Sequence, residues 1–208
     1  MPVLRGEILV GRFVFLAVCR HYEDVRDGPK RDLYFSPEKA WHVISFIERF
    51  HVHIKGPLAN LPILLDPWQK FWTAVLFGWR RLEDGLDAGR RFQTAYEEVA
   101  RKNGKSTWKG PQGNYLWLMD GEIGAEVYAV ATTRNQAMTV FSPAFENVKK
   151  WARKSAGCAR SFKIHEGANQ ERLISDTSVF KPIPATADTL DGLNPSGILF
   201  DELHAQKD

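Results

Sequence analysis

Four side chains in this sequence have the types and the spacing needed to hydrolyse a nucleoside triphosphate. Lys105 and Ser106 follow a glycine in the run Ala-Arg-Lys-Asn-Gly-Lys-Ser-Thr at residues 100–107. In such a loop the lysine reaches the β- and γ-phosphates, and the serine hydroxyl joins the shell of a bound Mg²⁺. Asp201 and Glu202 follow an apolar run near the end of the chain. One such carboxylate can hold the metal while the other activates a water molecule.

The loop departs from the usual phosphate-binding pattern at one position. That pattern has a glycine six residues before the lysine, and this sequence has Val99 there. The loop keeps Gly104, which lets the backbone approach a phosphate closely, and it precedes a predicted helix whose first N–H groups would face the anion. The residues that we expect to bind the nucleotide are Lys102, Asn103, Gly104, Lys105, Ser106 and Thr107.

The acidic pair follows a short predicted strand at residues 197–200. In α/β folds, ligands bind where the carboxyl ends of the strands meet at one edge of the sheet. We therefore expect Asp201 to hold Mg²⁺ and Glu202 to act as the general base. The separation of 96 residues between Lys105 and Asp201 leaves room for one or two strand–helix units, as a shared site requires.

The elements that must position these residues alternate between helix and strand. Helices are predicted at residues 36–49, from 66 to about 79, from the loop to about 120, and over 133–155. Strands are predicted at 91–100, 127–131, 161–165, 178–182 and 197–200, with a loop at 83–89. This alternation indicates an α/β domain with a mostly parallel sheet flanked by helices. We assign residues 66–208 to it, and residues 1–65 to a helical N-terminal extension.

Composition sets limits on the class of protein. The chain has 208 residues and a net charge of +3, too weak to indicate nucleic-acid binding by itself. The basic pairs at residues 80–81 and 90–91 are expected to lie on solvated helix faces. The two cysteines, Cys19 and Cys158, are far apart, which fits a reducing cytoplasm. The apolar run at residues 13–18 is too short to span a bilayer, so we expect a cytoplasmic protein.

Together these segments resemble a known family, the large subunit of tailed-phage terminases of the HK97-like type. The loop at residues 100–106 is similar to the variant phosphate loop of that family, which also lacks the first glycine. Further matches follow in order: Asp-Pro-Trp-Gln-Lys at 66–70, Ala-Thr-Thr-Arg-Asn-Gln-Ala at 131–137, Leu-Asp-Gly-Leu-Asn-Pro at 190–195 and Phe-Asp-Glu-Leu-His at 200–204. The resemblance covers nearly the whole chain.

The resemblance implies a P-loop ATPase of the ASCE/RecA-like type that uses ATP and Mg²⁺ to drive double-stranded DNA into a procapsid. Its implied partners are the portal protein and the small terminase subunit, in a homo-oligomeric ring within the host bacterial cell. By matching position, Arg101 would neutralise charge on the γ-phosphate in cis. Gln69 is a candidate for adenine recognition, since its amide offers a donor and an acceptor; a solvent-facing Gln69 is the alternative.

Two features of the chain differ from this family. Pro111 lies inside the helix after the loop, where we expect it to kink the helix or end it after about one turn. The chain stops six residues after Glu202, so we expect a truncated protein without a nuclease domain. Two alternatives to a packaging ATPase remain: another nucleic-acid-linked P-loop ATPase such as a helicase, and an inactive remnant that binds nucleotide or DNA.

Overall fold

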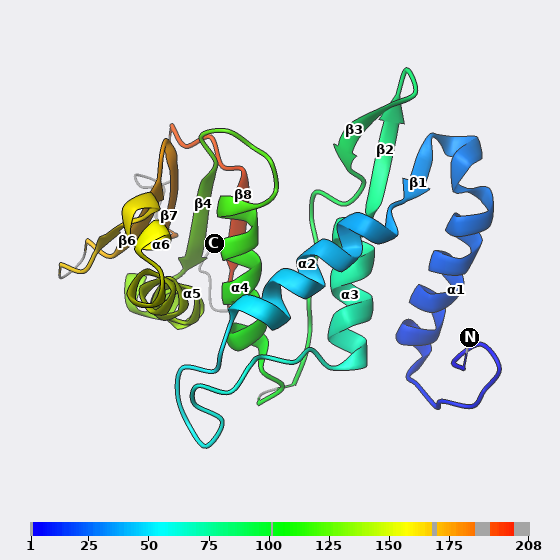
Figure 1. Ribbon diagram of the computed structural model, residues 1–208. Helices are drawn as coiled ribbons and strands as arrows, with labels where there is room; N and C mark the ends of the chain where they lie inside the picture. The colour runs from blue at the N-terminus through cyan, green and yellow to red at the C-terminus, as the bar shows by residue number, and fades with distance from the viewer. Residues whose placement is uncertain (1, 101, 168–169, 186–191, 202–208) are drawn as a thin grey trace. The chain divides into compact units, whose positions relative to one another are not determined.

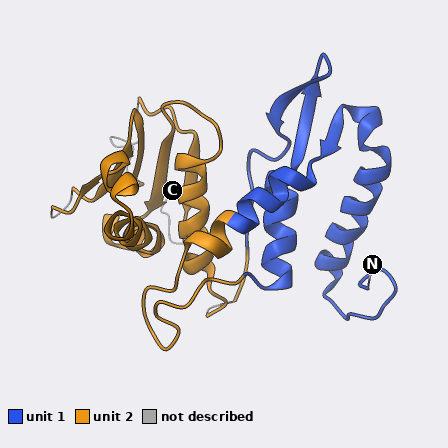
Figure 2. Ribbon diagram, in the orientation of Figure 1, with its two compact units in different colours: residues 1–45, 65–97 blue, residues 46–64, 98–208 orange. Residues whose placement is uncertain are grey.

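The computed structural model describes residues 2–100, 102–167, 170–185 and 192–201. The chain divides into two compact units (Figure 2). Unit 1 comprises Met1–Ser45 and Leu65–Glu97, and unit 2 comprises Phe46–Leu64 and Glu98–Asp208. The predicted N-terminal extension thus contributes residues to both units, and the division into domains at residues 65 and 66 stays a prediction.

Unit 1 combines helices with a small antiparallel sheet of strand order β1-β2-β3. Its elements are α1 (Arg12–Asp27), the 3-10 helix η1 (Gly28–Arg31), β1 (Leu33–Phe35), most of α2 (Pro37–Phe50), α3 (Pro67–Gly78), β2 (Trp79–Glu83) and β3 (Leu86–Arg90). The two helices predicted in this region are confirmed as α2 and α3.

The hairpin of β2 and β3 replaces the loop that we predicted at residues 83–89, so that prediction is wrong. Asp84 and Gly85 form its two-residue turn, with φ of 51° and 78°. Two residues with positive φ give the turn twist that matches the twist of paired strands, and Asp-Gly is a favoured sequence for it. This dipeptide was the signal in the sequence that could have identified the hairpin.

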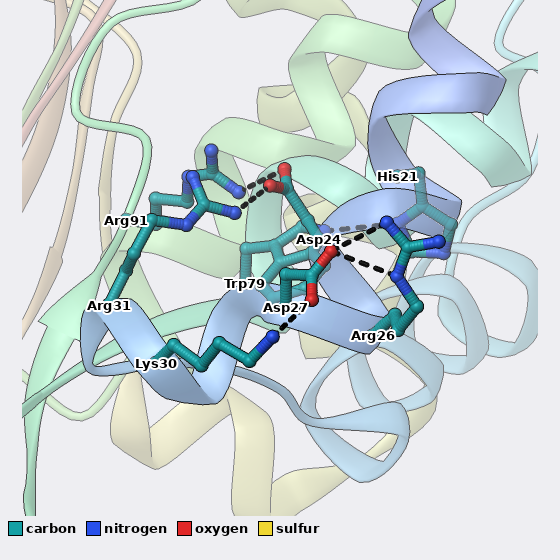
Figure 3. Close-up of polar contacts among 8 residues, drawn as sticks. All are labelled: His21, Asp24, Arg26, Asp27, Lys30, Arg31, Trp79 and Arg91. Carbon is teal, nitrogen blue, oxygen red and sulfur yellow. Dashed lines mark hydrogen bonds and ion pairs between the residues drawn. The ribbon is translucent and has the colours of Figure 1, made fainter.

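A cluster of ion pairs within unit 1 holds α1 next to the hairpin (Figure 3). The Asp24 side chain is buried and accepts hydrogen bonds from Arg31 and from Arg91, the latter at 2.5 Å. Burial alone would raise the pKa of Asp24, but the hydrogen bonds from both arginines outweigh it and lower that pKa. The expectation of solvated helix faces is therefore wrong here: Arg80 and Arg81 lie on β2, Arg90 ends β3, and the side chain of Arg91 is only 18% exposed.

Unit 2 is built on a five-stranded sheet of order β5-β6-β7-β4-β8 (Figure 1). Its central strand β4 pairs in parallel with both β7 and β8, while β6 joins β5 and β7 antiparallel. The strands are β4 (Glu126–Ala131), β5 (Lys163–His165), β6 (Arg172–Ser175), β7 (Ser178–Pro184) and β8 (Gly197–Phe200), and the helices are α4 (Lys105–Leu118), α5 (Arg134–Lys154) and α6 (Ala156–Ser161). The α/β class is confirmed.

The core of unit 2 lies between one face of this sheet and the helices α4 and α5. Strand β4 is buried along nearly its whole length, as its run of apolar residues predicts for a central parallel strand. Thr133 and Gln136 begin α5 with a capping box, which satisfies free N–H groups of its first turn. The buried residues of this core are Trp117, Val127, Ala129, Val140, Phe141, Ala144, Phe145, Val148, Leu173 and Phe180.

Two predictions about the segment around the loop are wrong. Residues 92–100 form no strand. A strand needs a neighbour to pair with, and in the described part of the chain β8 ends the sheet order without a further strand beside it. For Pro111 we expected a kink or an end of the helix after about one turn; the expected end is wrong, since α4 continues to Leu118. Because Gly110, Pro111 and Gln112 are all buried, packing compensates for the hydrogen bond that the proline cannot donate.

No helix among the described residues has both the length and the apolar character that a membrane span requires.

Candidate nucleotide-binding site

The phosphate-binding loop has two residues in the left-handed region of backbone conformation. Lys102 has a φ of 70° and Gly104 a φ of 69°. The side-chain amide of Asn103, which lies between them, donates to the carbonyl of Ala100 at 3.0 Å and so closes the loop. Residues that alternate between right-handed and left-handed backbone conformation point successive N–H groups toward the same side. This arrangement forms a concave site that binds anions.

Helix α4 begins at Lys105, directly after Gly104. Lys105, Ser106 and Thr107 therefore occupy its first turn, and all three are half-buried. The first N–H groups of a helix have no partner within the helix, and the helix dipole adds partial positive charge there. The loop and this first turn thus combine backbone donors with the Lys105 ammonium and the Ser106 hydroxyl, all of which suit a phosphate.

The structure brings the two halves of the predicted site together. Lys105 Nζ lies 3.0 Å from Asp201 Oδ1. Asp201 is only 6% exposed, and its N–H donates to the carbonyl of Val130 at 3.0 Å, which extends the pairing of β8 with β4 by one residue. Loop and carboxylate are 96 residues apart in the sequence, so their meeting is a consequence of the fold.

Close packing fixes α4 against the sheet behind this site. A Cβ atom on Gly113 would lie 2.5 Å from Phe180 Cζ and 2.8 Å from Leu199 Cδ1. A Cβ atom on Gly110 would lie 3.0 Å from the carbonyl oxygen of Val140 in α5. The absence of side chains at both glycines therefore lets α4 approach β7, β8 and α5 closely, and this holds its N-terminus beside the end of β8.

The residues present fit a Mg²⁺ ion bound together with a nucleotide. Asp201 Oδ1 is buried and, within the described residues, has the ionic contact with Lys105 but no hydrogen bond of good geometry. A buried carboxylate oxygen in that state can coordinate a metal ion directly or accept a hydrogen bond from a water bound to the metal. The part of the chain that the structure describes has no group of three or more Asp, Glu, His or Cys side chains that could hold a metal ion by itself. Mg²⁺ commonly uses one or two protein ligands, with phosphates and water completing its shell.

The two residues predicted to act on the γ-phosphate, Arg101 and Glu202, lie outside the described residues. Their roles stay predictions.

Gln69, the predicted adenine contact, lies on α3 in unit 1. It is 7% exposed, so the alternative of a solvent-facing side chain is wrong. Its Oε1 accepts a hydrogen bond from the N–H of Asp66 at 2.9 Å, as part of the capping box that begins α3. The amide nitrogen is the group left to recognise a base, and that role stays a prediction.

A buried polar network behind the site was not predicted. His51 is 1% exposed, and its Nε2 accepts from the Asn114 amide of α4 at 3.1 Å. Burial lowers the pKa of His51 to about 3, and backbone hydrogen bonding offsets only part of this effect. Asn147 of α5 bonds both the N–H and the carbonyl of Val52, at 2.8 and 3.1 Å. These bonds tie the segment after α2 to both helices that support the site.

Comparisons with known proteins identify the family of this chain and support its fold. The family model for the terminase large subunit, ATPase domain, matches residues 67–208. A solved structure, the crystal structure of the HK97 bacteriophage large terminase, is similar with 26% sequence identity and a TM-score of 0.61. The similarity covers 82% of this chain and 33% of that chain. A search of curated proteins gives no match.

Since the family model spans more than half of the chain, this chain belongs to the terminase large subunit family, in its ATPase domain. The family confirms the predicted resemblance and replaces the helicase alternative. The chain spans a third of the length of the HK97 terminase chain that it resembles.

Proposed function

We propose that this member of the terminase large subunit family binds ATP with Mg²⁺ at the loop of residues 100–107 and hydrolyses it to drive double-stranded DNA into a procapsid. The observation that carries the proposal is the 3.0 Å contact between Lys105 Nζ and Asp201 Oδ1. It joins a lysine at the start of a helix with a buried carboxylate at the carboxyl end of a parallel strand, which is where α/β folds bind their ligands.

The residues have separate tasks in this proposal. The backbone N–H groups of Lys102, Asn103 and Gly104 and the first turn of α4, with Thr107, surround the phosphates. Lys105 contacts the β- and γ-phosphates. Ser106 and Asp201 hold Mg²⁺, which neutralises phosphate charge when it is bound.

Hydrolysis would be carried out by the two residues outside the described ranges. Glu202 accepts a proton from the attacking water, whose oxygen forms the new bond to the γ-phosphorus as the bond to the β–γ bridging oxygen breaks. Arg101 stabilises the negative charge on the γ-phosphate. The products are ADP and inorganic phosphate.

The ion pair has a consequence for binding. In the structure, the charge of Lys105 is balanced by Asp201. An incoming triphosphate competes with Asp201 for this ammonium, and a bound metal would in turn balance the carboxylate. Nucleotide binding leaves Asp201 without its partner Lys105, and metal binding balances the charge of Asp201. Nucleotide and metal should therefore bind cooperatively.

The proposed partners follow from family membership. They are double-stranded DNA, the portal protein and the small terminase subunit, with a homo-oligomeric ring as the working form. Because this chain spans a third of the HK97 terminase chain, the packaging cycle is proposed for the whole protein. For this chain by itself, the proposed step is the binding of ATP.

A second candidate is a terminase remnant that binds nucleotide without turning it over. The observation that favours it is the lack of a strand at residues 92–100, because phosphate loops in α/β folds usually follow a strand of the central sheet. A loop without that support would bind phosphate but hold it less firmly for in-line attack.

ATP turnover tests the catalytic part of this proposal. The assay compares the parent with Glu202→Ala, which removes the proposed base, and with Lys154→Ala, a control in the last turn of α5. We expect Glu202→Ala to bind ATP normally and to lose any turnover that the parent has, while the control matches the parent. Turnover that is unaffected by Glu202→Ala would contradict the assignment, and a parent that binds ATP without turnover would favour the remnant.

A further inference from the structure

Helix α4 and strand β8 meet along their whole common length, with the first turn of the helix beside the end of the strand. The residues of α4 that face β8 are three or four apart, so they lie on one side of the helix. In order along α4 the neighbouring pairs are Lys105 with Asp201, Lys109 with Phe200, Gly113 with Leu199 and Leu116 with Gly197. The second of these pairs is polar, and the proposed function does not use it.

Lys109 acts on the peptide group that carries Asp201. Its Nζ donates to the carbonyl oxygen of Phe200 at 3.2 Å. The N–H of Asp201 belongs to the same peptide group and donates to the carbonyl of Val130 at 3.0 Å. Since a peptide group is planar and its C=O and N–H point in opposite directions, the two bonds hold this plane from both sides.

The pairing of β8 with β4 determines the direction in which the Phe200 carbonyl points. In the sheet order, β8 has β4 on one side, and the described residues place no strand on the other side. The Phe200 carbonyl points toward that open side, because the N–H of the same peptide points toward β4. The Lys109 ammonium donates to this carbonyl, and its charge makes the hydrogen bond stronger than one from a neutral donor.

We propose that Lys109 is a positioning residue that orients the Asp201 carboxylate for Mg²⁺. This inference rests on the proposed function, in which Asp201 holds the metal. Lys109 does not contact the metal or the nucleotide in this account. It fixes the backbone from which the Asp201 side chain projects, so its removal should weaken the metal-dependent part of nucleotide binding and leave the metal-independent part unchanged.

The expected size of the effect follows from other metal sites. Groups that orient a metal ligand without touching the metal typically contribute 10- to 100-fold to metal affinity. Because Mg²⁺ here shares its shell with phosphates and water, we expect the lower end, about tenfold.

The test measures ATP affinity by titration calorimetry with and without Mg²⁺ in the parent, Lys109→Met and Lys109→Arg. Methionine keeps much of the length and apolar stem of lysine but has no donor, while arginine keeps a charged donor. Lys163→Met, at an exposed position on β5, is the matched control. We expect the gain in ATP affinity from Mg²⁺ to fall about tenfold in Lys109→Met, with ATP affinity in EDTA unchanged. Lys109→Arg should recover part of the gain, and Lys163→Met should match the parent.

A second readout does not depend on nucleotide. Hydrogen exchange at the Asp201 amide should be faster in Lys109→Met than in the parent, while the melting temperature of the two proteins stays similar. Equal Mg²⁺ dependence in the parent and Lys109→Met would overturn the positioning role, and so would equal exchange at Asp201. A parent that binds no ATP at all, with faster Asp201 exchange in Lys109→Met, would instead contradict the proposed function and leave the orienting contact established.

Discussion

At the scale of single residues, the site depends on a charged side chain that the fold buries. Asp201 is 6% exposed and lies 3.0 Å from Lys105. Bringing a carboxylate out of water is unfavourable unless it is paired or coordinates a metal. The structure pairs Asp201 with a flexible lysine, whose ammonium can turn to a phosphate when one arrives. This exchange of partners is the basis of the proposed cooperation between ATP and Mg²⁺.

Asp24 is the second residue of this kind, in unit 1, and its removal should destabilise the protein. Asp24→Asn loses the charge that Arg31 and Arg91 contact. Since hydrogen bonds to charged groups contribute about 1.5–3 kcal/mol, we expect a loss in unfolding free energy of about this size at pH 7, measured by urea denaturation. Asp27→Asn is the control, because the Asp27 side chain is 32% exposed and that of Asp24 is 6% exposed, and it should lose less unfolding free energy.

The pH dependence of the unfolding free energy of the parent and of Asp24→Asn tests whether the charge of Asp24 causes the expected loss of stability. The folded-state pKa of Asp24 is lowered, so its charge contributes stability above the unfolded-state pKa of about 3.9. This contribution is lost as the pH falls through the folded-state pKa. The stability difference between the parent and Asp24→Asn should therefore narrow below about pH 4. A difference that stays constant between pH 7 and pH 3 would show that packing, and not charge, is responsible.

His51 should make the protein sensitive to mild acid. Its folded-state pKa is about 3 because it is buried, and its unfolded-state pKa is about 6.5. The neutral imidazole therefore contributes stability above pH 6.5 that is lost as the pH falls toward 3, at up to about 1.4 kcal/mol per pH unit. His51→Gln keeps an amide that can accept from Asn114 but does not titrate.

Urea denaturation at pH 7 and pH 4.5 measures this effect. We expect the parent to lose about 2 kcal/mol more than His51→Gln over this interval. Equal losses in both proteins would mean that His51 becomes protonated without cost and is not buried in solution.

At the scale of elements, the close approach of α4 to the sheet is the feature that places the loop. Gly113→Ala would put a Cβ atom 2.5 Å from Phe180 Cζ and 2.8 Å from Leu199 Cδ1. Overpacking of this kind typically costs about 1–3 kcal/mol, which thermal unfolding can measure. Gly157→Ala in α6 is the control, since its nearest neighbour would be Ser155 Oγ at 3.5 Å. It should be neutral or slightly stabilising, and an equally mild Gly113→Ala would show that α4 is not closely packed.

The sequence predicted those elements whose pattern is local and missed those that depend on a partner. Helix α5 and strand β4 follow from apolar spacing, capping residues and a continuous apolar run. The strand predicted at residues 91–100 has suitable β-forming residues, but strand formation requires a neighbour, which no local pattern supplies. For the site, the loop pattern predicted Lys105 as a phosphate contact and the acidic end of the last strand predicted Asp201 as a Mg²⁺ ligand, and the structure brings these two side chains together. Lys109 was not predicted, because its role depends on the pairing of α4 with β8.

Pro111 also shows that a local pattern does not account for tertiary packing, here for a helix that continues where the pattern predicted a disruption. By local propensity, a proline in the middle of a helix costs about 3 kcal/mol, and this predicted that the helix is kinked or ends after about one turn. Helix α4 continues because its middle part is buried between the sheet and α5. The free energy of packing therefore outweighs the preference of one residue, as it does for Pro143 in α5.

At the scale of the whole molecule, the predicted adenine contact belongs to unit 1 and the phosphate-binding loop to unit 2. The role of Gln69 in recognising the base stays a prediction. Gln69→Glu is the informative substitution, because a glutamate oxygen can still accept from the N–H of Asp66 and keep the cap of α3. It loses the amide donor. We expect the preference for ATP over GTP to fall about tenfold, since a lost hydrogen bond contributes about 1 kcal/mol or more.

Competition binding of ATP and GTP measures that preference, with the melting temperature as a check on folding. If Gln69→Glu keeps the preference of the parent, Gln69 serves α3 alone and the base is recognised elsewhere.

The most direct test of the central claim is the equilibrium binding of ATP, in the presence of Mg²⁺, to the parent and to Lys105→Ala. If residues 102–107 and Asp201 form the nucleotide site, the parent binds one ATP per chain and Lys105→Ala binds it at least about tenfold more weakly, since it loses a charge-assisted contact with the phosphates. Equal affinity of the two proteins for ATP would contradict the assignment of the site.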